Sequence, residues 1–179
     1  MRHGISFTLA LPDSAGLDLF DCGEREVDGF FRDRRWFDPR RSVASPPTYE
    51  FRSQPDAPVI GYASVAFRLV EHPHDRGEGR RKYLTIYALG IDRRFQGLPN
   101  PALPSETYAR SILGILECFA EGRPECPGLS LWVRIANARA LRFYERAGFV
   151  ADPSGPVRRD AGSPHLTMRK FLRGGGDPP

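Results

Sequence analysis

Hydrophobic and polar residues along the chain follow two periods, which together predict an alternation of strands and helices. Short runs rich in β-branched and aromatic residues predict strands at 5–10, 48–52, 59–70, 82–92, 129–135 and 164–172. Apolar residues at three-to-four spacing predict helices at 22–36, from 105 through 119, and from 138 to 147. This order predicts an α/β fold in which a mixed central β-sheet has helices on both faces.

Caps and turns mark the limits of these elements. Ser105 is expected to cap the second helix and Asn137 the third, which Gly148 ends just past its last turn. The proline-rich segment 38–47 predicts a loop or a short broken helix, and 72–81 predicts a polar turn. Since no linker is long enough to divide the chain, we expect a single domain over 1–172 and a disordered tail at 173–179.

Composition adds a hydrophobic core and a mild basic excess. The chain has 179 residues, of which 40% are hydrophobic, and a net charge of +4 that permits an anionic partner without requiring one. The three cysteines, Cys22, Cys118 and Cys126, lack zinc-ligand spacing, so we expect reduced thiols in a cytoplasmic protein and no metal site. The apolar run 5–11 is too short for a signal peptide, and no run approaches membrane-spanning length, so no membrane partner is expected.

The stretch 131–149, LWVRIANARALRFYERAGF, combines a strand, an asparagine cap, a short helix and a glycine stop. Taken alone, it predicts a plain strand–helix unit with a core tyrosine. It also resembles the late segment of the GNAT superfamily of acetyl-CoA-dependent acyltransferases, N-x-x-A-x-x-x-Y-E-x-x-G-F. The matching residues are Asn137, Ala140, Tyr144, Glu145, Gly148 and Phe149. The resemblance implies a GNAT-like fold, acetyl-CoA as cosubstrate, a cofactor contact by Asn137, and a Tyr144 that protonates the leaving thiolate.

The stretch 93–113, RRFQGLPNPALPSETYARSIL, resembles the family's pyrophosphate segment, Q/R-x-x-G-x-G/A, with an insertion. Without a gap, the two small positions would fall on prolines, which have no N–H for an anion. With an insertion of about eight residues, Ala109 takes the last small position. The alternative is that the insert abolishes cofactor binding and leaves a non-catalytic relative.

The resemblance implies that backbone groups of a predicted strand bind the pantetheine arm, polarise the acetyl carbonyl, and are followed by the phosphate-binding loop. The cofactor-binding residues expected on this basis are Leu89, Gly90, Ile91, Arg94, Gln96, Gly97, Ser105, Thr107, Tyr108, Ala109 and Asn137. No general base stands out. Glu71, His72 and His74 precede the strand, but each is more often a surface turn residue.

The stretch 19–35, LFDCGEREVDGFFRDRR, resembles the N-terminal segment of GNAT-type toxins that acetylate aminoacyl-tRNA. The matching residues are Phe20, Cys22, Gly23, Val27, Asp28, Phe30 and Phe31, and Cys22 is expected to be a packing residue. The arginines Arg32, Arg34, Arg35 and Arg41 could form an RNA-facing patch. A solvated helix face is the alternative, because neighbouring aspartates dilute the positive charge.

Three functions stay open at this point. The first is a toxin-like acetyltransferase whose acceptor is the α-amino group of aminoacyl-tRNA, an amine that needs little help from a base. The second is an acetyltransferase for a small-molecule or peptide amine, and the third is a degenerate GNAT fold used for protein interaction. The first would bring an antitoxin protein as partner, and a homodimer is compatible with all three.

Overall fold

The computed structural model describes residues 4–14, 16–40, 43–70, 81–157 and 163–172. These residues belong to two compact units. The first is made from Met1–Ala66 and Tyr87–Leu116, and the second from Phe67–Ile86 and Glu117–Pro179. The residues Glu71, His72, His74 and Arg41, most of the predicted turn at 72–81 and the tail at 173–179 lie outside the described residues.

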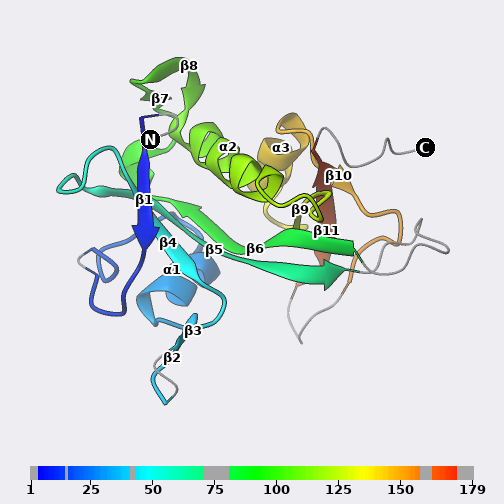
Figure 1. Ribbon diagram of the computed structural model, residues 1–179, viewed down its shortest axis with the longest axis horizontal. Helices are drawn as coiled ribbons and strands as arrows, with labels where there is room; N and C mark the ends of the chain where they lie inside the picture. The colour runs from blue at the N-terminus through cyan, green and yellow to red at the C-terminus, as the bar shows by residue number, and fades with distance from the viewer. Residues whose placement is uncertain (1–3, 15, 41–42, 71–80, 158–162, 173–179) are drawn as a thin grey trace. The chain divides into compact units, whose positions relative to one another are not determined.

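Seven strands form a mixed sheet in the order β1-β4-β5-β6-β9-β11-β10 (Figure 1). They are β1 Ser6–Leu9, β4 Thr48–Arg52, β5 Val59–Val70, β6 Arg81–Ile91, β9 Gly128–Arg134, β10 Val150–Ala151 and β11 His165–Phe171. Strands β6 and β9 pair in parallel, whereas β4 pairs antiparallel with β5 and β9 with β11. The described helices are α1 Arg25–Arg32, α2 Tyr108–Glu121 and α3 Ala138–Arg146, with a 3₁₀ turn η1 at Arg93–Phe95. The predicted α/β fold with a mixed sheet is therefore confirmed.

The first unit has its core between α1 and strand β5. Tyr62, on β5, is fully buried and its ring lies 5.0 Å from that of Phe20 and 5.4 Å from that of Phe31. Trp36 and Leu17 complete the same hydrophobic cluster. Phe20, Phe31 and Trp36 thus face inward and hold α1 against strand β5.

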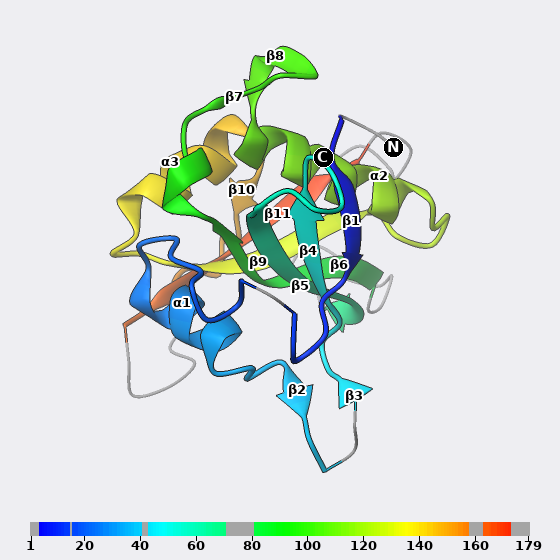
Figure 2. The same ribbon diagram turned by 90° about the vertical axis from the view of Figure 1, so that its left-hand side faces the viewer.

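Two short hairpins in the first unit differ from the predicted loops (Figure 2). Strands β2 Phe37–Asp38 and β3 Val43–Ala44 pair antiparallel where a loop or broken helix was expected. Strands β7 Pro99–Asn100 and β8 Leu103–Thr107 pair inside the predicted insertion, so the insertion is an ordered β-hairpin. Ser105 lies on β8 and does not cap a helix, because α2 begins three residues later.

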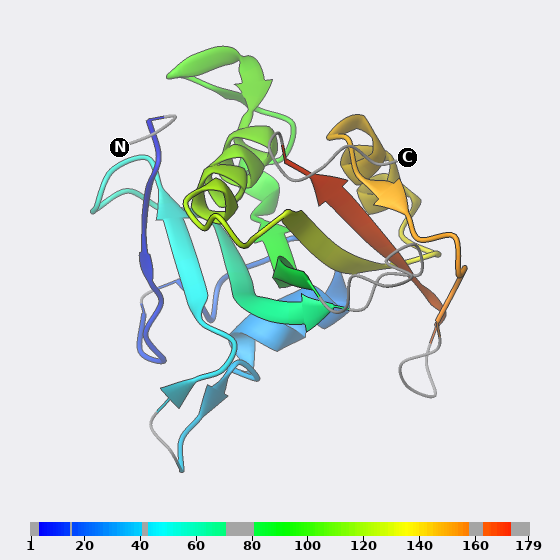
Figure 3. The same ribbon diagram turned by 45° about the vertical axis from the view of Figure 1, so that its right-hand side comes forward.

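The second unit contains β9, β11, β10 and helix α3, seen together in Figure 3. A buried ion pair joins β11 to the residue that follows β10. Arg169 Nη2 lies 2.7 Å from Asp152 Oδ2, and the two side chains are only 5% and 3% exposed. The ends of α3 are as predicted. Asn137 Oδ1 accepts a bond from the Ala140 amide, and Gly148, with φ +88°, forms a Schellman motif in which the Phe149 amide bonds Tyr144 O.

Candidate functional site

The end of strand β6 is packed against the segment that leads into α1. A Cβ atom on Gly90 would lie 2.8 Å from Phe20 Cζ and 3.1 Å from Val27 Cγ1. A Cβ on Gly61 of the neighbouring strand β5 would lie 2.5 Å from Gly90 O. The backbone at Gly90 is thus closely approached by Phe20 and Val27, and by strand β5 at Gly61.

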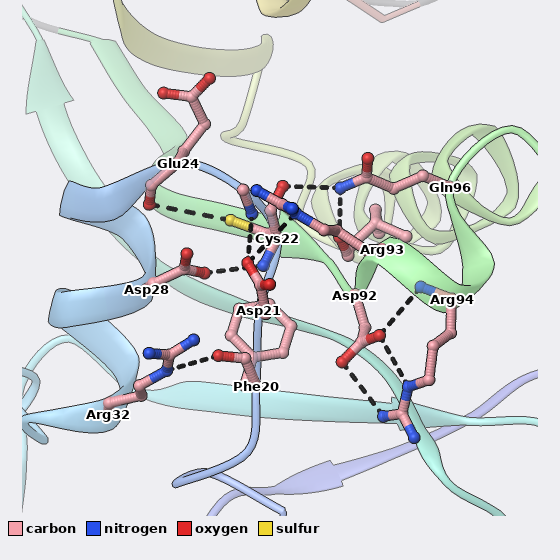
Figure 4. Close-up of polar contacts among 12 residues, drawn as sticks. Phe20, Asp21, Cys22, Glu24, Asp28, Arg32, Asp92, Arg93, Arg94 and Gln96 are labelled. Carbon is pink, nitrogen blue, oxygen red and sulfur yellow. Dashed lines mark hydrogen bonds and ion pairs between the residues drawn. The ribbon is translucent and has the colours of Figure 1, made fainter.

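Cys22 is held from two sides, as Figure 4 shows. Its amide donates to Asp28 Oδ1 at 2.7 Å, and its carbonyl accepts from Gln96 Nε2 at 2.7 Å. The same Gln96 nitrogen donates to Ile91 O at 2.7 Å. We call Cys22, Asp28, Ile91 and Gln96 the Cys22 network. Burial, and after it the interaction of the thiol with the Asp28 side chain, raises the pKa of the Cys22 thiol to about 12, so it stays protonated and packs as expected.

Two arginines follow strand β6 and both have acidic partners (Figure 4). Asp92 accepts from the Arg94 amide at 3.0 Å, from its Nε at 2.8 Å and from its Nη2 at 3.1 Å. Burial acts to raise the pKa of Asp92, but the Arg94 bonds outweigh it and the pKa is lowered. Arg93 Nε lies 3.3 Å from Asp21 Oδ1. The Arg94 side chain remains 62% exposed, so an anion can still reach it.

The β7–β8 hairpin is fastened to the first turn of α2. Asn100, which is 1% exposed, donates from Nδ2 to Ser111 Oγ at 2.9 Å and accepts the Ala102 amide at 3.1 Å. The Tyr108 amide donates to Leu98 O at 3.2 Å, and the Arg110 amide to Thr107 Oγ1 at 3.4 Å. Thr107, not Ser105, therefore supplies the capping hydroxyl. Two of the first three amides of α2 have partners inside the protein.

Gly97 takes a backbone conformation that the turn into the hairpin requires. Its φ is +75°, in the left-handed region, and no atom lies within 4 Å of an added Cβ. The first unit thus brings together most of the predicted cofactor residues along the end of β6, η1 and the hairpin. Asn137, the remaining predicted cofactor residue, and Tyr144, the predicted proton donor, lie in the second unit.

Tyr144 lies on the buried side of α3. It is 9% exposed, and its ring contacts those of Phe143 at 5.2 Å and Phe149 at 5.4 Å. Burial raises the pKa of Tyr144, so the hydroxyl is protonated at neutral pH and available to donate. We find no hydrogen bond from this hydroxyl to another described residue. Asn137 uses its amide oxygen for the cap, which leaves its NH₂ group for a ligand.

Some arginines of the predicted RNA patch are bonded to groups within the protein. Arg32 Nε donates to Phe20 O, and Arg34 donates to Pro12 O at 2.8 Å and to Asp18 Oδ1 at 2.6 Å. Arg34 has a φ of +51°, an unusual conformation for a residue other than glycine, which these bonds help to hold. Arg35 is exposed but lies 2.9 Å from Asp33. Arg32 and Arg34 therefore have structural roles that their sequence positions did not reveal.

Two residues that organise this region, Asn100 and Asp92, could not be recognised from local sequence signals. Asn-Pro pairs usually mark turns, and nothing local indicates that the Asn100 side chain is buried. Within the described ranges, no group of three or more histidine, cysteine or acidic side chains is placed to hold a metal ion. No described helix has both the length and the apolar character needed to cross a membrane.

Comparisons by sequence give no match to a family model and none to a curated protein. Solved structures are similar in fold. A bacterial toxin has a TM-score of 0.65 at 18% identity, over 93% of this chain and 90% of that one. The toxin AtaT complexed with acetyl-methionyl-tRNAfMet gives 0.58 at 19%, over 91% and 93%. Arabidopsis thaliana NAA60 in complex with a bisubstrate analogue gives 0.59 at 18%, over 94% and 99%. The chain therefore has the fold of the GNAT proteins.

Proposed function

We propose that this protein, over residues 1–172, is a GNAT-type N-acetyltransferase that moves an acetyl group from acetyl-CoA to a primary amine in the cytoplasm. The observation that carries the proposal is helix α3. It presents a buried, protonated Tyr144 between an Asn137 cap and a Gly148 stop, in the arrangement that the family motif implies. The likeness to AtaTR bound with acetyl-CoA supports the choice of cosubstrate.

We propose that the predicted cofactor residues bind acetyl-CoA with one adjustment. Backbone groups of Leu89, Gly90 and Ile91 would bind the pantetheine arm and polarise the acetyl carbonyl. The arginine side chain of Arg94, the amides of Gly97 and Ala109, and the NH₂ of Asn137 would bind the rest. The Tyr108 and Arg110 amides have partners within the protein. Side chains would therefore have to contribute more to pyrophosphate binding than they do in a glycine-rich loop.

The chemical step needs a neutral amine and a proton for the departing sulfur. The amine nitrogen attacks the acetyl carbon, a C–N bond forms, and the carbonyl becomes a tetrahedral oxyanion held by backbone N–H groups. As the C–S bond breaks, the Tyr144 hydroxyl gives its proton to the thiolate, and solvent takes the excess proton of the new amide and restores Tyr144. A low-pKa amine, such as the α-amino group of an aminoacyl ester, needs no dedicated base.

We propose aminoacyl-tRNA as the acceptor. The segment 19–35 resembles the matching segment of tRNA-acetylating toxins, and AtaT complexed with acetyl-methionyl-tRNAfMet has the same fold. AtaT bound to the C-terminus of the antitoxin AtaR supports an antitoxin as a further partner. A small-molecule or peptide amine is the second candidate acceptor.

Incubation with labelled acetyl-CoA and bulk aminoacyl-tRNA tests the proposal. We expect acetylated aminoacyl ends with the unmodified protein and far fewer with Tyr144→Phe. Labelled peptide or small-molecule amines in place of tRNA products would favour the second acceptor class. Absence of acetyl-CoA binding by calorimetry would contradict acetyl transfer altogether and favour a non-catalytic role.

A separate measurement tests the RNA contact. If arginines meet phosphates, tRNA affinity should fall steeply with salt. Because Arg34 is bonded to Asp18 and Pro12, the informative change is Arg35→Ala, from the predicted patch, together with Arg40→Ala at a neighbouring exposed arginine. An unchanged dependence of tRNA affinity on salt would remove this patch from the proposal.

A further inference from the structure

We propose that Gln96 is a positioning residue for acyl transfer and not a ligand of the cofactor. The proposal rests on the proposed function, which places the acetyl group beside the end of β6. It departs from what the position of Gln96 in the pyrophosphate segment implies, and it assigns the residue a task through the Cys22 network.

The first observation is that both N–H groups of the Gln96 side chain are used within the protein. A side-chain amide has two donor hydrogens, and Gln96 Nε2 lies 2.7 Å from Cys22 O and 2.7 Å from Ile91 O (Figure 4). The residue is half-buried. To donate to a phosphate, the side chain would have to leave two carbonyl groups without this donor, which is costly in a partly buried place.

The second observation is that the two carbonyls belong to different segments. Ile91 is the last residue of β6, whereas Cys22 lies 74 residues from Gln96 along the sequence. Asp28, a buried residue of α1, accepts a hydrogen bond from the Cys22 amide. The Cys22 network therefore forms a continuous chain of bonds from α1 through Cys22 and Gln96 to the end of β6.

The third observation is what this chain of bonds holds in place. Phe20 and Val27 flank Cys22 in sequence and are the side chains that approach Gly90. Arg93 reinforces the same junction, because its amide donates to Asp21 O at 2.8 Å and its guanidinium lies beside Gly23. Without Gln96, the α1 segment can move away from Gly90, and the backbone groups proposed to polarise the acetyl carbonyl lose their support.

The test compares Gln96→Glu, Gln96→Arg and a matched control. Gln96→Glu keeps the side-chain shape but removes both donors, whereas Gln96→Arg supplies N–H donors again. Gln54→Glu makes the same chemical change at an exposed loop position of the same unit. For each variant, acetyl-CoA affinity is measured by calorimetry and single-turnover acetylation of the tRNA acceptor gives the rate of the chemical step.

We expect Gln96→Glu to lower the single-turnover rate about 10-fold or more while the Kd for acetyl-CoA changes less than about threefold, the pattern of lost positioning. Gln96→Arg should recover most of the rate, and Gln54→Glu should match the unmodified protein. A parallel loss of acetyl-CoA affinity and rate in Gln96→Glu would make Gln96 a cofactor ligand and overturn the proposal. An unchanged rate would overturn it as well. An unmodified protein that neither binds acetyl-CoA nor transfers acetyl groups refutes the proposed function itself, which these variants alone cannot do.

Discussion

The insertion between Gly97 and Tyr108 should contribute to stability, and Asn100→Ala is the change that tests it. Asn100 is 1% exposed and bridges the hairpin to α2 through Ser111 Oγ at 2.9 Å, while its own oxygen takes the Ala102 amide at 3.1 Å. Ser111 in turn donates to Glu106 Oε2 at 3.2 Å. Alanine removes the centre of this network and leaves the buried Ser111 oxygen without the Asn100 donor.

The magnitude follows from these bonds. Each lost hydrogen bond costs about 0.5–1.5 kcal/mol net, and a buried group left unpaired adds about 1 kcal/mol or more. Two bonds and one unpaired group give a loss of about 2–4 kcal/mol in the free energy of unfolding. For a chain of this size, each kcal/mol lowers Tm by about 2–4 °C, so we expect a fall of roughly 4–16 °C.

Urea and thermal unfolding followed by circular dichroism measure the effect. Ser105→Ala is the matched control, because Ser105 lies exposed on β8 of the same hairpin and should change stability by less than about 0.5 kcal/mol. If the free energy of unfolding of Asn100→Ala is within about 0.5 kcal/mol of that of the unmodified protein, the hairpin is not fastened to α2 as the structure indicates.

Three further changes test other parts of the molecule. Tyr144→Phe should lower turnover by roughly 10²-fold or more, with acetyl-CoA affinity almost unchanged. A single-turnover rate equal to that of the unmodified protein would refute the role of Tyr144 as proton donor. Asp152→Ala leaves the buried Arg169 charge without this carboxylate, so urea unfolding should show a free energy of unfolding lower by about 3–5 kcal/mol. A decrease below about 1 kcal/mol would contradict a stabilising role of this ion pair. The folded pKa of Asp92 is lowered, so its stabilising effect is complete above the unfolded pKa and is lost as pH falls from there through the folded pKa. Unfolding at several pH values should show less acid sensitivity in Asp92→Asn, and equal sensitivity would contradict the lowered pKa.

Local periodicity predicted the strands and helices well because their core-facing residues repeat with the period of the element. The predicted strands 48–52 and 59–70 have the bounds that the structure shows for β4 and β5. Asn137 and Gly148 mark the ends of α3 as expected, since caps and left-handed glycines are signals within a few residues. The GNAT-like α/β fold followed from these elements and from one motif.

The prediction failed where a contact distant in sequence competes with a local signal. Ser105 followed by Glu106 has the features of a helix start, but the pairing of Pro99 with Thr107 draws this segment into β8. The interaction of Gln96 with Cys22 could not be predicted for the same reason, because the two residues meet only after the chain folds. Counting arginines between 32 and 41 also could not show that Arg34 is tied to Pro12 and Asp18.

The hairpin also changes how the loop after β6 can bind an anion. In a glycine-rich loop, successive amides point at the phosphates and the helix dipole adds to their attraction. Here the Leu98 carbonyl and the Thr107 hydroxyl occupy the Tyr108 and Arg110 amides, so the protein supplies acceptors of its own at the start of α2. Amides that would be available to a ligand in a glycine-rich loop are therefore already bonded within the protein in this hairpin. On the proposed function, we expect this loop to need less reordering when acetyl-CoA binds, and more of the affinity to come from Arg94 and from the pantetheine arm along β6.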